Sequence, residues 1–166
     1  MSLFIDRGSR FLHALRVNRR GIAAVEFALI APILFFLGVG FVQFGVVLNQ
    51  YVELTDGVRV AARQLGLSRT DSSPYSNTVT ALTNATTNLS SSNLNYYLCV
   101  NTSGGTCTSG ATTQCTSDSN CSSALTAAGA GLAVTVTATY SCSLVVMGHD
   151  FLPGCQLSSS TTEMIE

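Results

Sequence analysis

The chain has 166 residues, enough for one modest domain, and 46% of them are hydrophobic while only 10% are charged. This balance is unusual for a soluble globular protein and indicates that part of the chain does not face water. The formal net charge is −1, but residues 22–166 carry three arginines against eight acidic residues, a formal charge of −5. An acidic bulk excludes nucleic-acid binding through phosphate neutralisation, so no nucleic-acid partner is expected.

The N-terminal end is basic. The chain contains no lysine, and five of its eight arginines fall within the first 20 residues. We interpret residues 1–21 as a short basic leader that is separate from the acidic remainder. Its arginines are Arg7, Arg10, Arg16, Arg19 and Arg20.

Residues 22–48 form an apolar run whose only charged residue is Glu26. As a helix this run would be about 40 Å long, enough to cross a hydrocarbon core of about 30 Å. It therefore predicts a transmembrane helix, in which Pro32 and several glycines are tolerated with a kink or local melting. Because the arginines precede the span, the positive-inside rule places the N-terminus in the cytoplasm and the C-terminal part across the membrane.

The pattern becomes two-faced in residues 49–66, which predict an amphipathic extension of the same helix. We expect the helix to continue to about Leu65 and to stop at Gly66, a residue type common just past helix ends. Apolar residues recur at spacings of three or four, at Val47, Tyr51, Leu54, Val58, Ala61 and Leu65.

Residues 67–166 predict a small extracytoplasmic domain rich in Ser, Thr, Asn and Gly. Val79, Leu82, Ala85 and Leu89 hint at one short helix, and residues 101–123 predict a long loop pinned by disulfides. The clearest strand covers residues 133–146, where apolar and hydroxyl side chains alternate. Residues 96–100 are its candidate partner strand.

All six cysteines lie in the last 68 residues, which indicates an oxidising compartment and disulfide bonds. Six cysteines allow 15 pairings, and sequence alone does not choose between them. A zinc site is disfavoured because no two cysteines are two to four residues apart, and we expect no metal. The cysteines are Cys99, Cys107, Cys115, Cys121, Cys142 and Cys155.

The junction of leader and span reads RRGIAAVEF, from Arg19 to Phe27. A glycine at Gly21 lets a protease backbone approach closely, and the arginines hold the leader at the cytoplasmic face. Glu26 lies about one turn inside the apolar helix, where a carboxylate costs about 2.5–3.5 kcal/mol and therefore needs a partner, unless it simply snorkels to water.

This junction resembles the type IV prepilin processing site, in which a membrane-embedded prepilin peptidase cuts directly after the glycine. The resemblance implies cleavage between Gly21 and Ile22, so that Glu26 becomes the fifth residue of the mature chain. It also implies that Glu26, next to Phe27, pairs with the free Ile22 amine of a neighbouring subunit during assembly.

Residues 19–69 resemble the TadE-like proteins of the Flp/Tad (tight adherence) pilus system. The resemblance rests on RRGIAAVEFALIAPILFFL and on NQYVELTDGVRVAARQLGLSR, although the glycine after Ala61-Ala62-Arg63 is displaced to Gly66. It implies a minor pseudopilin of the inner membrane, because a major Flp pilin would have almost nothing after the helix. The implied partners are the prepilin peptidase, other pilins and pseudopilins, the inner-membrane pilus assembly machinery and the lipid bilayer.

We expect no enzymatic activity, catalytic residue or cofactor. His149-Asp150 lacks a nucleophile elbow, and no phosphate loop or paired-carboxylate arrangement appears. The expected fold is α+β, with a long N-terminal transmembrane helix followed by a small disulfide-bonded, β-containing extracytoplasmic domain. The alternative is an unprocessed single-span membrane protein whose extracytoplasmic domain binds or anchors. Release by ordinary signal peptidase is disfavoured, because the apolar run exceeds the usual 7–15 residues and lacks an Ala-x-Ala end.

Overall fold

The computed structural model describes residues 19–101, 107, 114–146 and 148–166. The chain divides into two compact units, residues 1–42 and residues 43–166. Of the predicted leader, residues 1–18 lie outside the described residues. The predicted α+β class is confirmed, with one long apolar helix and a small antiparallel sheet domain that holds three disulfides.

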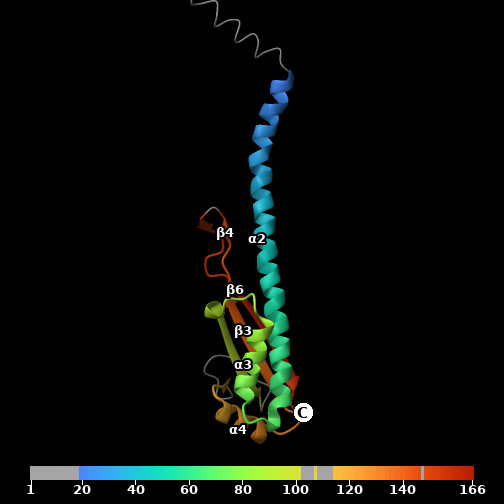
Figure 1. Ribbon diagram of the computed structural model, residues 1–166, viewed down its shortest axis with the longest axis vertical. Coiled ribbons are helices and arrows are strands. Elements are labelled where there is room, and N and C mark those ends of the chain that lie inside the picture. Colours follow the sequence, from blue (N-terminus) through green and yellow to red (C-terminus); the bar gives the residue numbers. More distant parts are fainter. Residues whose placement is uncertain (1–18, 102–106, 108–113, 147) are drawn as a thin grey trace, which may run out of the picture. The chain divides into compact units, whose positions relative to one another are not determined.

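Helix α2, Arg19–Leu67, is a single 49-residue α-helix (Figure 1). It is unbroken at Pro32, so the local melting that we allowed for there does not occur. The predicted stop at Gly66 is wrong, because the helix continues to Leu67 and is followed by the short 3-10 helix η1, Ser68–Thr70. The glycine at position 66 is explained by packing instead, because a Cβ there would lie 2.8 Å from the backbone oxygen of Met164.

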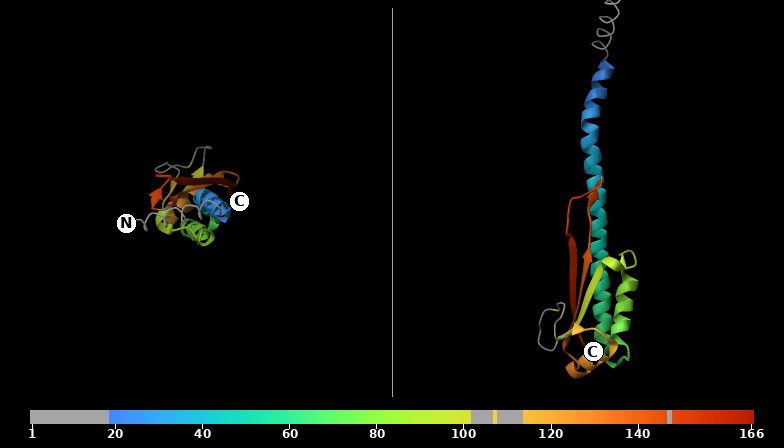
Figure 2. Two further views of the ribbon diagram at one scale, coloured as in Figure 1. Left: turned by 90° about the horizontal axis from the view of Figure 1, so that it is seen from above. Right: turned by 90° about the vertical axis from the view of Figure 1, so that its left-hand side faces the viewer.

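In the second unit, one face of α2 enters the core. Figure 2 shows this part of the helix between the sheet on one side and α3, Pro74–Ala85, on the other. The predicted apolar periodicity is confirmed at four positions, while Tyr51 stays 45% exposed. The fully buried residues of this face are Leu54, Val58, Ala61, Ala62 and Leu65.

The sheet has the strand order β2-β1-β3-β6, and every neighbouring pair is antiparallel. Strand β1, Leu94–Asn101, pairs with β3, Ala133–Ser141, which confirms the predicted partnership of these segments. Strand β2 is short, Gln114–Cys115. The edge strand β6, Gln156–Met164, was not predicted, because its run of Ser and Thr carries little apolar alternation.

The two faces of the sheet differ as the alternation of the predicted strand requires. Val134, Val136 and Ala138 are fully buried toward the helices. On the opposite face, hydroxyl groups pair across β3 and β6, with Thr137 Oγ1 lying 2.8 Å from Ser160 Oγ. Thr135 and Thr162 make a similar 2.9 Å contact. The polar face of β6 thus uses cross-strand hydrogen bonds where apolar packing is missing.

Two helices complete the core. Helix α3 begins with Pro74, whose fixed φ and missing N–H suit the first turn of a helix. Helix α4, Asp118–Ala128, contradicts the long loop predicted over 101–123, of which residues 102–106 and 108–113 lie outside the described residues. The helix begins there because the Ser117 hydroxyl accepts a hydrogen bond from the Asn120 N–H at 3.3 Å. Its apolar spacing, Cys121 and Leu125, was too sparse to predict a helix.

The strand predicted over 133–146 is broken at Ser141. The N–H of Cys142 donates to the Cys155 oxygen, and the chain then leaves the sheet as a short hairpin. Its strands are β4, Val145–Val146, and β5, His149–Asp150. Alternation continues through residue 144, but β6 supplies no partner beyond Gln156, so the regular strand ends.

Each of the three disulfides joins two cysteines that are consecutive among the cysteines of the chain: Cys99 with Cys107, Cys115 with Cys121, and Cys142 with Cys155. The predicted disulfide bonding is confirmed, and one of the 15 pairings is now assigned. Each bond closes a local loop, since the bonded cysteines are separated by 8, 6 and 13 positions in the sequence, respectively.

Candidate functional site

The predicted processing residues, Gly21 and Ile22, lie in the first turn of α2 as the structure describes it. Gly21 is exposed, and a Cβ there would meet nothing within 4 Å, so no packing inside this chain requires a glycine. Ile22 is 61% exposed.

Glu26 and Phe27 follow one turn later on the same helix. Both are exposed, Phe27 by 69%. Ile22 and Glu26 are four residues apart, a spacing that places them on the same helical face. The structure thus brings the predicted processing and assembly residues onto one short length of helix, which follows directly from their sequence spacing.

The apolar surface of α2 continues well beyond these residues. Its most apolar 18-residue window has a mean hydropathy of 2.4, and none of that window is buried. Phe41, for example, is 74% exposed. Such a helix has the length and composition of one membrane crossing, the pattern of a single-pass membrane protein.

In the second unit, two carboxylates hold neighbouring elements together. Glu53 on α2 accepts hydrogen bonds from the Asn88 N–H at 2.8 Å and from Asn88 Nδ2 at 3.3 Å. Asp118 on α4 accepts from the Ser76 N–H at 2.9 Å and from the Ser76 hydroxyl at 2.6 Å. Sequence reasoning missed both contacts. Ser117-Asp118 is typical of a helix start. However, the partner of Glu53 lies 35 residues away and that of Asp118 lies 42 residues away, so no local sequence pattern indicates these contacts.

These contacts change the acid–base chemistry of their groups. The hydrogen bonds from Ser76 lower the pKa of Asp118 because they stabilise the ionised carboxylate. Partial burial raises the pKa of Tyr75, with the neighbouring Tyr96 and Asp118 adding to the rise. The Asp118 shift thus comes from hydrogen bonds that join α3 to α4, and the Tyr75 shift comes mainly from burial.

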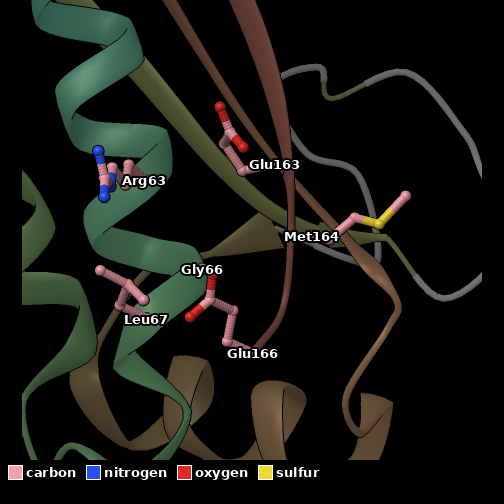
Figure 3. A pocket seen from close by; sticks show the side chains of 6 residues that line it. All are labelled: Arg63, Gly66, Leu67, Glu163, Met164 and Glu166. Atoms are coloured by element: carbon pink, nitrogen blue, oxygen red, sulfur yellow. The ribbon is translucent and has the colours of Figure 1, made fainter.

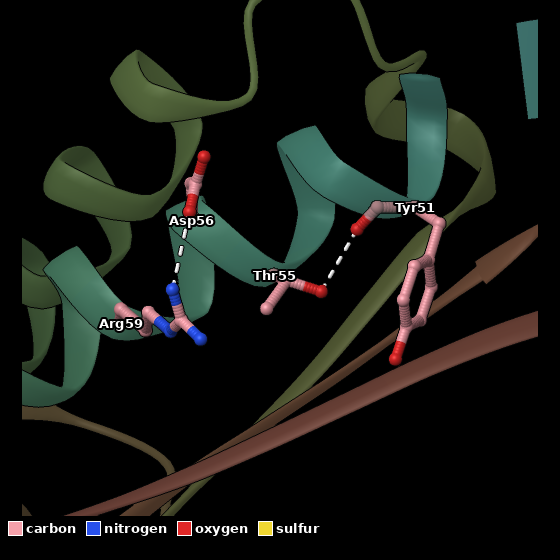
Figure 4. A network of polar contacts seen from close by, with 4 residues as sticks. All are labelled: Tyr51, Thr55, Asp56 and Arg59. Atoms are coloured by element: carbon pink, nitrogen blue, oxygen red, sulfur yellow. Dashed lines mark hydrogen bonds and ion pairs between the residues drawn. The ribbon is translucent and has the colours of Figure 1, made fainter. Parts of the chain in front are cut away.

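On the exposed side of α2, residues 51–59 make contacts within the helix itself (Figure 4). The Thr55 hydroxyl donates to the Tyr51 carbonyl oxygen at 2.8 Å. Arg59 and Asp56 form an exposed ion pair of 3.6 Å, one helical turn apart. A pair this exposed contributes little to stability and marks a solvated helix face.

One cavity of about 260 Å³ opens where the end of α2 meets the end of β6 (Figure 3). Gly66 and Met164 are among its lining residues, and the Glu166 N–H donates to the Gly66 oxygen at 3.2 Å. Arg63, Glu163 and Glu166 are the charged groups of its lining. Among the residues that the structure describes, no group of three His, Cys, Asp or Glu side chains is arranged to hold a metal ion.

His149 and Asp150, the pair considered for catalysis, are both exposed on β5. Asp150 Oδ1 accepts the Leu152 N–H at 3.0 Å, which is a local turn contact. The contact belongs to the turn that follows β5, before Pro153-Gly154.

Residues 21–63 match the family model described as TadE-like protein. No curated protein matches the chain, and no solved structure matches it. The matched segment begins at Gly21 and ends at Arg63, so it covers the exposed apolar helix and most of its buried continuation, and stops before the disulfide-bonded sheet. The chain therefore carries a TadE-like region at residues 21–63, consistent with a TadE-like, Tad pilus-associated protein of the Flp/Tad system.

Proposed function

We propose that this protein is a minor pseudopilin that supports assembly of a Flp/Tad adhesive pilus and is processed by prepilin peptidase after Gly21. The observation that carries this proposal is the TadE-like match, which begins at Gly21, at the head of an exposed apolar helix with one carboxylate near its start. A pseudopilin acts by assembling with other subunits, so the proposed role is not enzymatic.

In this proposal the chain crosses the bacterial inner membrane once. The five N-terminal arginines keep the leader in the cytoplasm, where the peptidase acts, and the acidic sheet domain lies in the periplasm. Three disulfides and the absence of a free cysteine suit that oxidising compartment. Cleavage removes all five leader arginines, and with them the charge that anchors the N-terminus at the cytoplasmic face.

Cleavage also creates a charged amine at Ile22. Glu26 then offers the carboxylate that such an amine needs, because an unpaired charge at membrane depth is costly. The two groups lie one turn apart in a single chain, so pairing between neighbouring subunits would shift one helix along another by about 6 Å, four residues at 1.5 Å each. This pairing would fix the axial register between subunits.

The test is the mature N-terminus of the protein in its native membrane, with and without the prepilin peptidase. We expect an N-terminus at Ile22 that is absent from the peptidase-deficient strain. Gly21→Val should block cleavage, because its branched side chain obstructs the approach of the protease backbone. Gly38→Val is the matched control, since Gly38 is an equally open helical glycine, and this variant should be cleaved normally.

A second arm of the same experiment examines Glu26. Glu26→Gln should be inserted and cleaved like the wild type but fail to support pilus assembly, while Glu26→Asp should retain part of it because the charge remains. An N-terminus that stays at Met1 in both strains would contradict processing. It would favour the alternative, an unprocessed single-span membrane protein with a binding or anchoring domain.

A further inference from the structure

The hairpin that leaves the sheet after Ser141, described at residues 142–146 and 148–155, exposes large apolar side chains. Phe151 is 63% exposed, Leu152 48% and Val145 45%. The hairpin is closed at its base by the Cys142–Cys155 disulfide and by the hydrogen bond from the Cys142 N–H to the Cys155 oxygen. The Phe151 N–H donates to the Leu144 oxygen at 2.9 Å, so Phe151 is hydrogen-bonded to the chain just before β4. Val145 lies in β4, and Phe151 and Leu152 directly follow β5.

Contacts within the second unit fix which end of the domain carries this hairpin. At one end of the sheet, Met164 and Glu166 contact Gly66 of α2, and Met164 is paired with Ala133. At the other end, Tyr140 is paired with Leu94, which follows closely on the Asn88 that binds Glu53. Strand β3 therefore runs antiparallel to α2. Its Ala133 end lies at the Gly66 end of the helix, and its Tyr140 end lies toward Glu53.

The lengths of the two elements agree with this direction. Glu53 to Gly66 is about 20 Å of helix, and Ala133 to Tyr140 is about 23 Å of strand. The hairpin continues past Ser141, and Figures 1 and 2 show β4 beyond the end of β3, on the side away from the C-terminus. It thus lies at the end of the second unit where Phe44, Val46 and Leu48 of α2 are themselves about half exposed.

The apolar run of residues 22–48 is longer than one hydrocarbon core requires, so its last residues would lie at the membrane surface. A hydrocarbon core takes about 20 helical residues, so a crossing that starts at Ile22 ends near Val42. The next residues, from Gln43 to Leu48, then occupy the headgroup region, at the level of the hairpin. Amphipathic and aromatic side chains are favoured in that region.

We propose that this hairpin is a second membrane contact, in which Phe151, Leu152 and Val145 insert into the headgroup region of the bilayer that α2 crosses. The disulfide and the hydrogen bonds at its base hold the apolar side chains in place, so the contact fixes the orientation of the domain against the membrane. Asp150 is exposed beside them and repels anionic headgroups, so the surface suits zwitterionic lipid. The proposal rests on the single crossing and not on cleavage after Gly21.

The absence of tryptophan from the chain allows a clean test with single-tryptophan variants of the full protein. Phe151→Trp reports on the hairpin. Met164→Trp is the matched control, since Met164 is 72% exposed at the opposite end of the sheet, and Phe35→Trp reports on the crossing. Each variant is placed at one chain per phosphatidylcholine nanodisc, with lipids brominated in the upper acyl chain.

We expect strong quenching of Phe35→Trp, roughly twofold quenching and a blue shift for Phe151→Trp, and an unchanged signal for Met164→Trp. If Phe151→Trp behaves like Met164→Trp while Phe35→Trp is quenched, the hairpin does not touch lipid and the proposal fails. A blue shift of Phe151→Trp that requires two chains per disc would instead assign the hairpin to a second copy. An unquenched Phe35→Trp would overturn the crossing itself, and the hairpin contact with it.

Discussion

Gly57 shows how tightly single residues are constrained where α2 passes α3. A Cβ at this position would clash with Thr86 Cγ2 and would lie 3.4 Å from Leu82 Cδ1. Thr86 has little freedom to move, because it is only 3% exposed and its hydroxyl donates to the Leu82 oxygen at 2.9 Å. The glycine therefore permits a close helix–helix contact, at the expense of helix propensity.

This contact predicts that the effect of Gly57→Ala on the free energy of unfolding changes sign when the Thr86 methyl group is removed. Gly57→Ala should lower the free energy of unfolding by about 1–3 kcal/mol, because the clash outweighs the helix propensity gain of about 1 kcal/mol. Combined with Thr86→Ser, which removes only the clashing methyl group, Gly57→Ala should instead be neutral or stabilising. Denaturant unfolding of the full chain in detergent, followed by near-UV circular dichroism, measures both. Equal effects in the two backgrounds would contradict the contact.

Asp118 is the residue through which pH should act on the domain. Its carboxylate is charged in both the folded and the unfolded chain at neutral pH, and Ser76 stabilises it only in the folded chain. Because the folded pKa lies below the ordinary value of 3.8, this contribution is complete above that value. It is lost as the pH falls through the lowered folded pKa.

The expected result is a stability difference between wild type and Asp118→Asn that is constant from neutral pH to about pH 5 and shrinks below about pH 4. The asparagine side chain does not titrate, so only the wild type should lose this contribution. Thermal unfolding of both proteins across this pH range measures the difference. A gap that stays constant to pH 2 would show that Ser76 does not lower the pKa.

At the scale of elements, the disulfides act on short loops, and their surroundings differ. Cys115 and Cys121 join β2 to α4 and are 2% and 0% exposed, within the apolar core. Cys142 and Cys155 close the hairpin at the edge of the sheet, where Cys155 is only partly buried. One bond is therefore part of the core, and the other holds a peripheral element in place.

Replacing either pair by alanine should remove about 2–3 kcal/mol of loop-closure stabilisation. Cys115→Ala with Cys121→Ala should cost more than this, because buried sulfur atoms leave cavities in the core. Cys142→Ala with Cys155→Ala should leave the core intact and loosen only the hairpin. Denaturant unfolding with amide hydrogen exchange distinguishes the two. Equal losses of stability, or equal protection of the hairpin, would contradict this division.

Helix α2 changes its chemical surroundings along its length without changing its secondary structure. From Ile22 to Leu48 its apolar side chains are exposed, whereas from Leu54 to Leu65 one stripe of them is fully buried. The helix ends where a backbone oxygen of β6 packs against Gly66. The same helix therefore presents exposed apolar side chains over one part of its length and a buried stripe over another.

For the molecule as a whole, four features could be predicted from the sequence alone: the length of the apolar span, the buried stripe of α2, the pairing of β1 with β3, and the presence of disulfides. These features have local periods or compositions, so hydropathy, spacing of three or four, and alternation reveal them. The TadE-like resemblance was likewise readable from residues 19–69, because it rests on contiguous motifs.

The other features of the fold became apparent only from the three-dimensional contacts. Strand β6 is a strand because β3 offers it hydrogen-bonding partners, and α4 forms where Ser117, Asp118 and Ser76 meet. The close approaches at Gly57 and Gly66 and the level of the hairpin along α2 depend on partners distant in sequence, and the cysteine pairing, although local, is one of 15 that the sequence left open. No local pattern encodes which distant group will satisfy a polar strand or fill the space beside a glycine, so these features appear only once the chain is folded.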